Sequence, residues 1–161
     1  MKHIKVLIIS LIISLLSLPS WGEVVSSTDI VWREGFYYKK FTNVPFTGKV
    51  TGLDNGRIKD GDREGLWMLY YKNGQLYRRE NYKNGRLDGP YENYNSRGNL
   101  TSKGTYKSGQ KDGLWEYHNE NGLYNKSFYK DDKLDGVVKH YSEDGSLHST
   151  KTYKNGVIVS E

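Results

Sequence analysis

The chain has 161 residues, of which 35% are hydrophobic and 27% charged, so it is long enough for one ordinary domain but has little material for a thick aliphatic core. It contains no cysteine, which excludes disulfides, a lipid-modified cysteine, thiol chemistry and cysteine-ligated metals. Its 24 basic and 19 acidic residues are interspersed, and no run of like charge marks a nucleic-acid-binding or polybasic membrane patch. Fourteen tyrosines and eighteen glycines favour many short strands joined by tight turns.

Residues 1–22 have the features of a secretory signal peptide. Positive charges near the start are followed by an apolar run over residues 4–18, and Pro19 and small residues then precede a cleavage point before Glu23. An uncleaved membrane anchor is the alternative, but the run is shorter than the ~18–20 residues that span a bilayer. We therefore expect an exported protein, either periplasmic or secreted.

Residues 23–64 are expected to form an N-terminal hairpin and a shortened capping repeat. The hairpin is predicted at residues 31–38, and the capping repeat begins near Gly48, only 17 residues before Gly65. Terminal units of repeat proteins are usually atypical because they cover an otherwise open edge. Residues 23–29 are polar and are expected to be loose.

Residues 65–161 contain an internal repeat of about 24 residues, which three series of turn residues reveal. The first series is Gly65, Gly89, Gly113 and Gly136, and the second is Gly74, Gly98, Gly122 and Gly145. The third series is Gly61, Gly85, Gly109, Asp132 and Gly156. Because the three series stay in register over four units, they indicate a stacked repeat architecture rather than chance similarity.

Each unit has the pattern of a β-hairpin. In the first, residues 66–71 form a strand-like run, Lys72-Asn73-Gly74-Gln75 is a turn, and residues 76–82 return as a second strand. Asn-Gly predicts a type I′ turn, in which both central residues have positive φ. The sequence therefore predicts an all-β protein: an elongated single-layer antiparallel sheet of successive β-hairpins, with a rise of about 10 Å per unit.

Aromatic residues recur at equivalent places in the units. One column contains Trp67, Tyr91, Trp115 and Val138, and another contains Tyr70, Tyr94, His118 and Tyr141. Such columns stabilise neighbouring hairpins through cross-strand ring pairs. A functional interpretation stays open beside this one: an exposed face of the sheet would present Trp67, Tyr91, Trp115 and Tyr117 to a partner.

The sequence lacks a recognisable catalytic or metal-binding pattern. His118 replaces a tyrosine in an aromatic column, and His140 and His148 have no metal-ligand spacing around them. Asp88, Asp112 and Asp135 each precede a repeat glycine, which favours a role in turns rather than in acid–base chemistry. We therefore expect no enzymatic activity, no metal and no cofactor.

The repeats resemble a known family in three cores, at residues 82–89, 106–115 and 129–136, each of which begins with Tyr-Lys and contains Asp-Gly. These cores are similar to the bacterial variant of the MORN repeat, and the block at residues 44–52 resembles the usual opening of that class. The resemblance covers roughly residues 30–157. It implies an elongated sheet of hairpins that serves as a binding scaffold without catalysis. Many bacterial members are classed as YwqK-type antitoxins, which are thought to neutralise a toxin partner.

Three functions remain open from the sequence. The first is an exported scaffold for a protein partner, with an antitoxin or immunity-like role as its specific form. The second is a cell-envelope or carbohydrate-binding module that uses exposed Tyr and Trp rows. The third is a membrane-surface binder, which the net charge of +3 expected after signal cleavage makes the weakest of the three.

Overall fold

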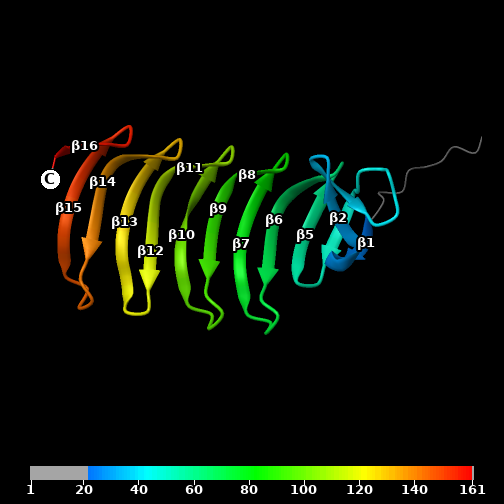
Figure 1. Cartoon of the computed structure of the whole chain (residues 1–161), viewed down its shortest axis with the longest axis horizontal. Coiled ribbons are helices and arrows are strands. Elements are labelled where there is room, and N and C mark those ends of the chain that lie inside the picture. Colours follow the sequence, from blue (N-terminus) through cyan, green and yellow to red (C-terminus); the bar gives the residue numbers. More distant parts are fainter. Residues whose placement is uncertain (1–21, 161) are drawn as a thin grey trace, which may run out of the picture.

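The computed structural model describes residues 22–160, so nearly all of the predicted signal peptide lies outside the described residues. The strands form one 14-stranded sheet and a separate two-stranded sheet. The larger sheet is a ribbon in which successive hairpins lie side by side along the long axis of the molecule (Figure 1). This architecture confirms the predicted all-β fold of stacked hairpins.

Two groups of strands follow one another along the chain. The N-terminal group comprises β1 (Glu23–Ser26), a short 3-10 helix (Ser27–Asp29), β2 (Ile30–Arg33), β3 (Phe36–Lys39), β4 (Gly48–Thr51) and β5 (Asp54–Lys59). The repeat group comprises β6 (Asp62–Tyr70), β7 (Leu76–Lys83), β8 (Arg86–Leu87), β9 (Gly89–Tyr94), β10 (Leu100–Lys107), β11 (Gln110–Lys111), β12 (Gly113–Asn119), β13 (Gly122–Lys130), β14 (Lys133–Tyr141), β15 (Leu147–Lys154) and β16 (Val157–Ser160).

The N-terminal end of the sheet carries a small core. The hairpin β2–β3 forms the separate sheet, and backbone hydrogen bonds join Tyr37 to Gly61 and to Phe46. The buried side chains of this core come from strands β1, β4, β5 and β6 and from the loop before β4. They are Val25, Phe46, Val50, Ile58 and Trp67. The cap therefore covers the first strands of the ribbon, as the terminal unit of a repeat protein must.

The expectation that residues 23–29 are loose is wrong. Residues 23–26 form β1, which pairs in parallel with β4, and Val25 is buried in the core. The flanking Val24 is 63% exposed, so this four-residue strand buries a single large side chain. A strand so short leaves no alternating pattern in the sequence, so periodicity does not predict it.

Two kinds of turn alternate along the ribbon, and only one of them has the predicted geometry. The turn after β7 has positive φ at both central residues, 49° at Asn84 and 74° at Gly85, as a type I′ turn requires. The type I′ prediction for Lys72–Gln75 is wrong, because only Gly74 has a positive φ there. The Asn73 side chain instead accepts a hydrogen bond from the Gln75 backbone at 3.1 Å, which stabilises a longer loop.

Backbone hydrogen bonds connect the turn of each unit to the preceding unit. They run from Gly85 to Arg63, from Gly109 to Leu87, from Asp132 to Lys111 and from Gly156 to Leu134, in each case from N–H to carbonyl. Asp132 holds a φ of 64° without being glycine, and its carboxylate accepts a second hydrogen bond from the Lys111 N–H at 2.7 Å. That bond offsets part of the ~1–2 kcal/mol that left-handed backbone costs.

Carboxylates near the start of the repeat units accept hydrogen bonds from backbone N–H groups of the next tight turn along the chain. Oxygens of the Glu64, Asp88 and Asp135 side chains accept hydrogen bonds from the backbone N–H groups of Asn84, Ser108 and Asn155, respectively. Each carboxylate therefore satisfies a donor some 20 residues further along the chain. The predicted turn role is confirmed for Asp88 and Asp135, although their bonds reach the next turn rather than nearby backbone, and among the described residues the Asp112 side chain makes no such bond. These bonds join neighbouring units along the tight-turn edge, the edge of the ribbon at which turns such as Asn84-Gly85 lie.

Two tryptophans lie directly against glycines of the neighbouring strand. A Cβ atom on Gly56 would lie 2.2 Å from the ring of Trp67, and one on Gly104 would lie 2.3 Å from the ring of Trp115. Each indole N–H also donates to a backbone carbonyl of that strand, at 3.1 Å for Trp67 and 3.2 Å for Trp115. Glycine is therefore required at these two places by packing and not by φ.

The glycine–tryptophan pairs alternate with pairs of different size. In the second unit the equivalent pair is Glu80 and Tyr91, and in the fourth it is Ser127 and Val138. The pair of a glycine and a tryptophan therefore occurs in every second unit, where the indole ring occupies the space that a side chain of the neighbouring strand would need.

We predict that Gly104 and Trp115 are energetically coupled. Gly104→Ser alone should lower the free energy of unfolding by about 1–3 kcal/mol because the new side chain overlaps the indole. In a Trp115→Val background, which reproduces the native Ser127–Val138 pair, the same change should cost at least about 1 kcal/mol less. Urea unfolding of the four proteins of this cycle measures the coupling, and additive effects would show that the overlap does not control packing.

Candidate functional site

One face of the ribbon, which we call the tryptophan face, carries an aromatic ladder in two parts. It consists of the pair Trp67–Tyr82 and of a group of four rings, Tyr91, Tyr106, Trp115 and Tyr129. Ring centroids within the pair and within the group lie 5.0–6.5 Å apart, mostly in edge-to-face arrangements. These distances confirm the stabilising interpretation for the column that contains Trp67, Tyr91 and Trp115, because ring pairs of this geometry add about 0.5–1.5 kcal/mol each beyond burial.

A basic side chain covers each of the two buried tryptophans. The guanidinium carbon of Arg63 lies 4.2 Å from the Trp67 ring centroid, and the Lys111 ammonium lies 4.3 Å from that of Trp115. The two positions are equivalent in the repeat, and leucines stand at the same place in the other two units. Cation–π contacts of this kind are worth about 0.5–2 kcal/mol. The basic side chains and the tyrosines together replace the second layer that a single sheet lacks.

This cover corrects the predicted partner-binding set of Trp67, Tyr91, Trp115 and Tyr117. Trp67 and Trp115 are each only 1% exposed, so neither indole is available to a partner. Tyr117 stacks on Trp115 and accepts a hydrogen bond from the Lys111 ammonium at 2.8 Å. Tyr91 and Tyr117 are half-buried, and partner binding by them stays a prediction. Repeat periodicity identified the face, but it carries no information about what covers that face.

A buried carboxylate lies among the first two units of the tryptophan face. Glu80 is 2% exposed, accepts a hydrogen bond from the Tyr82 hydroxyl at 2.9 Å, and lies 3.6 Å from Arg63 and 3.4 Å from Arg78. Two guanidinium groups thus balance one carboxylate, which avoids an unpaired buried charge. Burial, and then the adjacent Glu80 charge, raise the pKa of Tyr82 to about 12.

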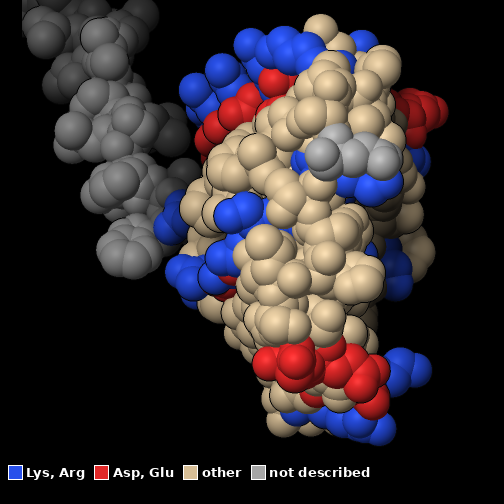
Figure 2. Space-filling view, turned by 90° about the vertical axis from the view of Figure 1, so that its left-hand side faces the viewer, with Lys and Arg blue, Asp and Glu red and all other residues tan. Residues whose placement is uncertain are grey.

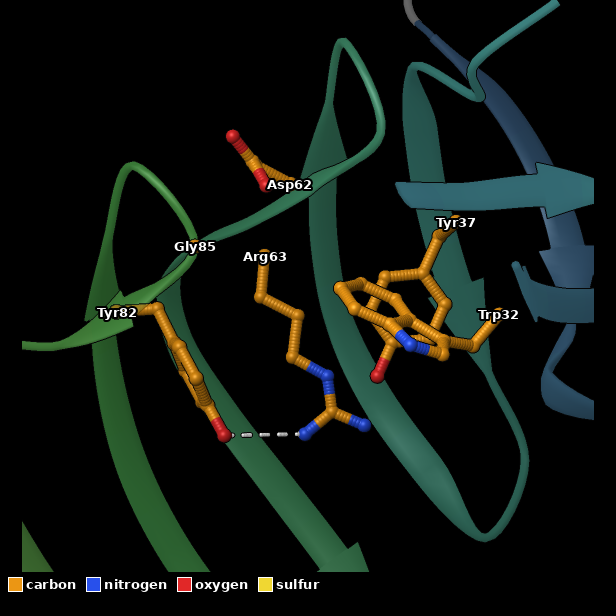
Figure 3. Close-up of a pocket in the computed structure, with 6 residues that line it drawn as sticks. All are labelled: Trp32, Tyr37, Asp62, Arg63, Tyr82 and Gly85. Carbon is orange, nitrogen blue, oxygen red and sulfur yellow. Dashed lines mark hydrogen bonds between the residues drawn. The ribbon is translucent and has the colours of Figure 1, made fainter. Parts of the chain in front are cut away.

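A cleft of about 300 Å³ lies between the capping hairpin and the first repeat unit. Its lining consists of Trp32, Tyr37, Asp62, Arg63, Tyr82 and Gly85. Figure 3 shows the Arg63 side chain between Tyr82 on one side and the Trp32–Tyr37 pair on the other, with Asp62 above it. Trp32 is 56% exposed and is thus the accessible tryptophan of the described residues, in contrast to Trp67 and Trp115.

The cleft residues could not be recognised as a group from the sequence, because they come from separate elements. Trp32 belongs to the atypical hairpin β2–β3, and Arg63 and Tyr82 belong to strands β6 and β7 of the first unit. No repeat pattern joins these segments. The one available signal was that Trp32 falls outside every aromatic column, which marks a tryptophan without a place in the ladder.

The opposite face carries two shallow hollows at equivalent places of the repeat. The Leu66 hollow, about 490 Å³, includes Gly56 and Leu66, and the Leu114 hollow, about 300 Å³, includes Gly104 and Leu114. Leu66 and Leu114 are 42% and 40% exposed, and Phe128, which pairs with Leu114 across the strands, is 43% exposed. Each hollow thus combines an exposed apolar side chain with the glycine strand against which a tryptophan packs from the other side.

Charged side chains border these hollows. Glu116 beside the Leu114 hollow bonds to the ammonium groups of Lys103 at 2.8 Å and Lys126 at 2.7 Å, and these bonds lower the pKa of the carboxyl group. Glu64 and Arg57 line the Leu66 hollow. An exposed apolar centre with a charged rim is the usual anatomy of a protein-binding patch.

The tight-turn edge of the ribbon carries an exposed lysine in each turn, at Lys59, Lys83, Lys107, Lys130 and Lys154. Figure 2 views the molecule from its C-terminal end and shows basic side chains along the upper edge with acidic ones beside them, and an acidic cluster with basic neighbours at the lower edge. Acidic residues such as Asp60 and Asp131 lie in the same turns, so the edge is a mixed surface rather than a uniform positive field.

Among residues 22–160, no group of three or more His, Cys, Asp and Glu side chains is arranged to hold a metal ion. Within the same part of the chain, no helix has the length and apolar character needed to cross a lipid bilayer.

We predict a loss of stability at high pH that depends on two tyrosines. Burial raises the pKa of Tyr82 and of Tyr129 to about 12, above the ~10 of an unfolded chain. The unfolded state therefore loses protons first, and the free energy of unfolding should fall as pH rises from about 10 to 12. The urea midpoint of the double variant Tyr82→Phe/Tyr129→Phe should fall less over this range than that of the wild type. Equal slopes would contradict the assigned burial.

A family model described as MORN repeat variant matches residues 63–84, 87–108 and 134–155. No curated protein matches the chain significantly. The matched segments begin at the equivalent residues Arg63, Leu87 and Leu134, and the structure places a fourth hairpin of the same form, β12–β13, between the second and third matches. That unit is one residue shorter than the first two and has Asp132 in place of the turn glycine. The chain is therefore a MORN-repeat protein.

Proposed function

We propose that the chain is an exported, non-catalytic repeat scaffold that binds a protein partner through the face opposite the tryptophans. Repeats of this kind commonly mediate protein or membrane interactions. The observation that carries the proposal is the pair of equivalent hollows around Leu66 and Leu114, because a regular array of equivalent sites is what repeat proteins offer to an extended partner.

The spacing of the hollows limits the shape of the partner. Gly56 on β5 and Gly104 on β10 are four strands apart in the sheet, which corresponds to about 19 Å. A partner helix would place apolar side chains about 13 residues apart to fill both hollows, and an extended segment would place them about six residues apart. We therefore infer a partner with one long helix or one extended strand bearing two apolar anchors.

A more specific version of this proposal is an antitoxin-like role, in which the scaffold neutralises a toxin. The resemblance to bacterial members of the repeat class supports this form, as does the apolar run at residues 4–18, which would direct the chain to the periplasm or the medium. Neutralisation requires tight binding, and a rigid sheet favours it because little conformational entropy is lost on association.

The test is affinity capture with two matched variants. Protein beginning at Glu23 is incubated with envelope and secreted fractions of its own cell, and the bound proteins are identified by mass spectrometry. A single protein recovered in near-equal amount should be lost with Leu66→Asp/Leu114→Asp, since a charge in each apolar hollow prevents burial. The control is Thr150→Asp, an exposed residue of the same face on β15.

The result that contradicts the proposal is recovery of no stoichiometric protein, or of one that the double variant binds as well as Thr150→Asp does. All proteins should first show the wild-type melting temperature. Trp67→Ala and Trp115→Ala are unsuitable for this test, because removing a buried indole costs about 3–5 kcal/mol of stability whatever the partner.

A further inference from the structure

The cleft beside Trp32 contains an aromatic side chain that the fold does not bury. Trp32 packs edge-to-face on Tyr37, with ring centroids 4.8 Å apart, and more than half of its surface faces solvent. It is not part of the buried cluster formed by residues such as Val50 and Trp67. A large exposed ring at the mouth of a cavity provides a flat apolar surface on which a ligand can stack.

Two polar groups with unused bonding capacity lie in the same cleft. The Asp62 carboxylate makes no hydrogen bond or ion pair with any residue that the structure describes, and it lies against the turn at Gly85. The Arg63 guanidinium donates one hydrogen bond, to the Tyr82 hydroxyl at 3.2 Å, and its Nε is buried without a partner among residues 22–160. The Nε atom is enclosed, but Arg63 lines the cleft and uses only one of its five N–H groups in a hydrogen bond, so the cleft offers both an acceptor and donors to a ligand.

The nearby charges favour a neutral ligand. A cation would meet Arg63, and an anion would meet Asp62 and, behind the guanidinium, Asp54 and Glu80, which lie 3.8 Å and 3.6 Å from Arg63. Different hydroxyl groups of one ligand can donate to the carboxylate and accept from the guanidinium, which lie at opposite ends of the cleft (Figure 3). A neutral ring with several hydroxyl groups and an apolar C–H face therefore matches the indole and both polar groups together.

We propose that this cleft binds a single neutral sugar ring of a glycan, with Trp32 as the stacking surface, Asp62 as hydroxyl acceptor and Arg63 as donor. The volume of about 300 Å³ lies at the lower limit of small-molecule sites, which suits one ring rather than a chain of rings. The site is separate from the Leu66 and Leu114 hollows of the proposed protein interface, so glycan and protein binding are independent.

Nuclear magnetic resonance tests the site on the chain beginning at Glu23, which contains every described strand. The probes are the methyl glycosides of glucose, galactose and N-acetylglucosamine at concentrations up to about 100 mM. At least one should shift the indole N–H signal of Trp32 saturably, with a dissociation constant of about 1–10 mM as expected for a ligand of this size. The indole signal of the buried Trp115, which lies outside the cleft, should not move.

Three variants identify the residues responsible, with binding read from saturation transfer to the sugar. Trp32→Ala and Asp62→Asn should each weaken binding about tenfold or more. Phe41→Ala, at a fully exposed aromatic residue of the same region that does not line the cleft, should bind as the wild type does. Asp62→Asn preserves the aromatic packing, so it reports on the ligand even if Trp32→Ala loosens the hairpin.

The proposal is overturned if no sugar shifts the Trp32 signal, or if Asp62→Asn and Phe41→Ala bind equally well. It is also overturned if no sugar binds and Trp32→Ala abolishes capture of a protein, since the cleft would then belong to the protein interface. Neither result decides the capture experiment with Leu66→Asp/Leu114→Asp, so failure of the two proposals can be told apart.

Discussion

The packing of two indole rings against two glycines is the contact on which this ribbon depends. A sheet one layer thick has no opposite layer to bury its side chains, and a domain without a core is marginal at best. Here Trp67 and Trp115 lie flat on their own sheet, bonded through the indole N–H, and are covered by Arg63 and Lys111. The apolar surface is thus enclosed within one face, and no second sheet is needed.

This arrangement makes stability a property of neighbouring units. The indole of one unit contacts the glycine strand before it and the tyrosine of the strand after it, while turn hydrogen bonds such as Gly85 to Arg63 join the same units at their edge. In repeat proteins such contacts add up unit by unit along the chain. The covered tryptophan face then serves as support, which leaves the opposite face and the Trp32 cleft for recognition.

The fold was predictable because its controlling positions repeat. Asn84-Gly85 and its equivalents fixed the tight turns, and the strand pattern between them fixed the hairpins. The burial of Trp67 and Trp115 was not predictable. It depends on cover by Arg63 and Lys111, residues that resemble ordinary surface charges in the sequence. The cleft escaped prediction for a related reason: Trp32, Asp62 and Tyr82 meet only through the packing of the cap on the first unit.

Hydrogen exchange at the indole N–H groups tests whether the glycine–tryptophan contacts hold the ribbon together. We predict that the Trp67 and Trp115 indoles exchange only through global unfolding, with a denaturant dependence equal to that of the whole protein. The exposed Trp32 is the internal control and should exchange rapidly without denaturant dependence. Exchange of Trp67 and Trp115 at rates close to that of Trp32 would show that the cover opens locally, and that the glycine–tryptophan contacts do not hold the ribbon together.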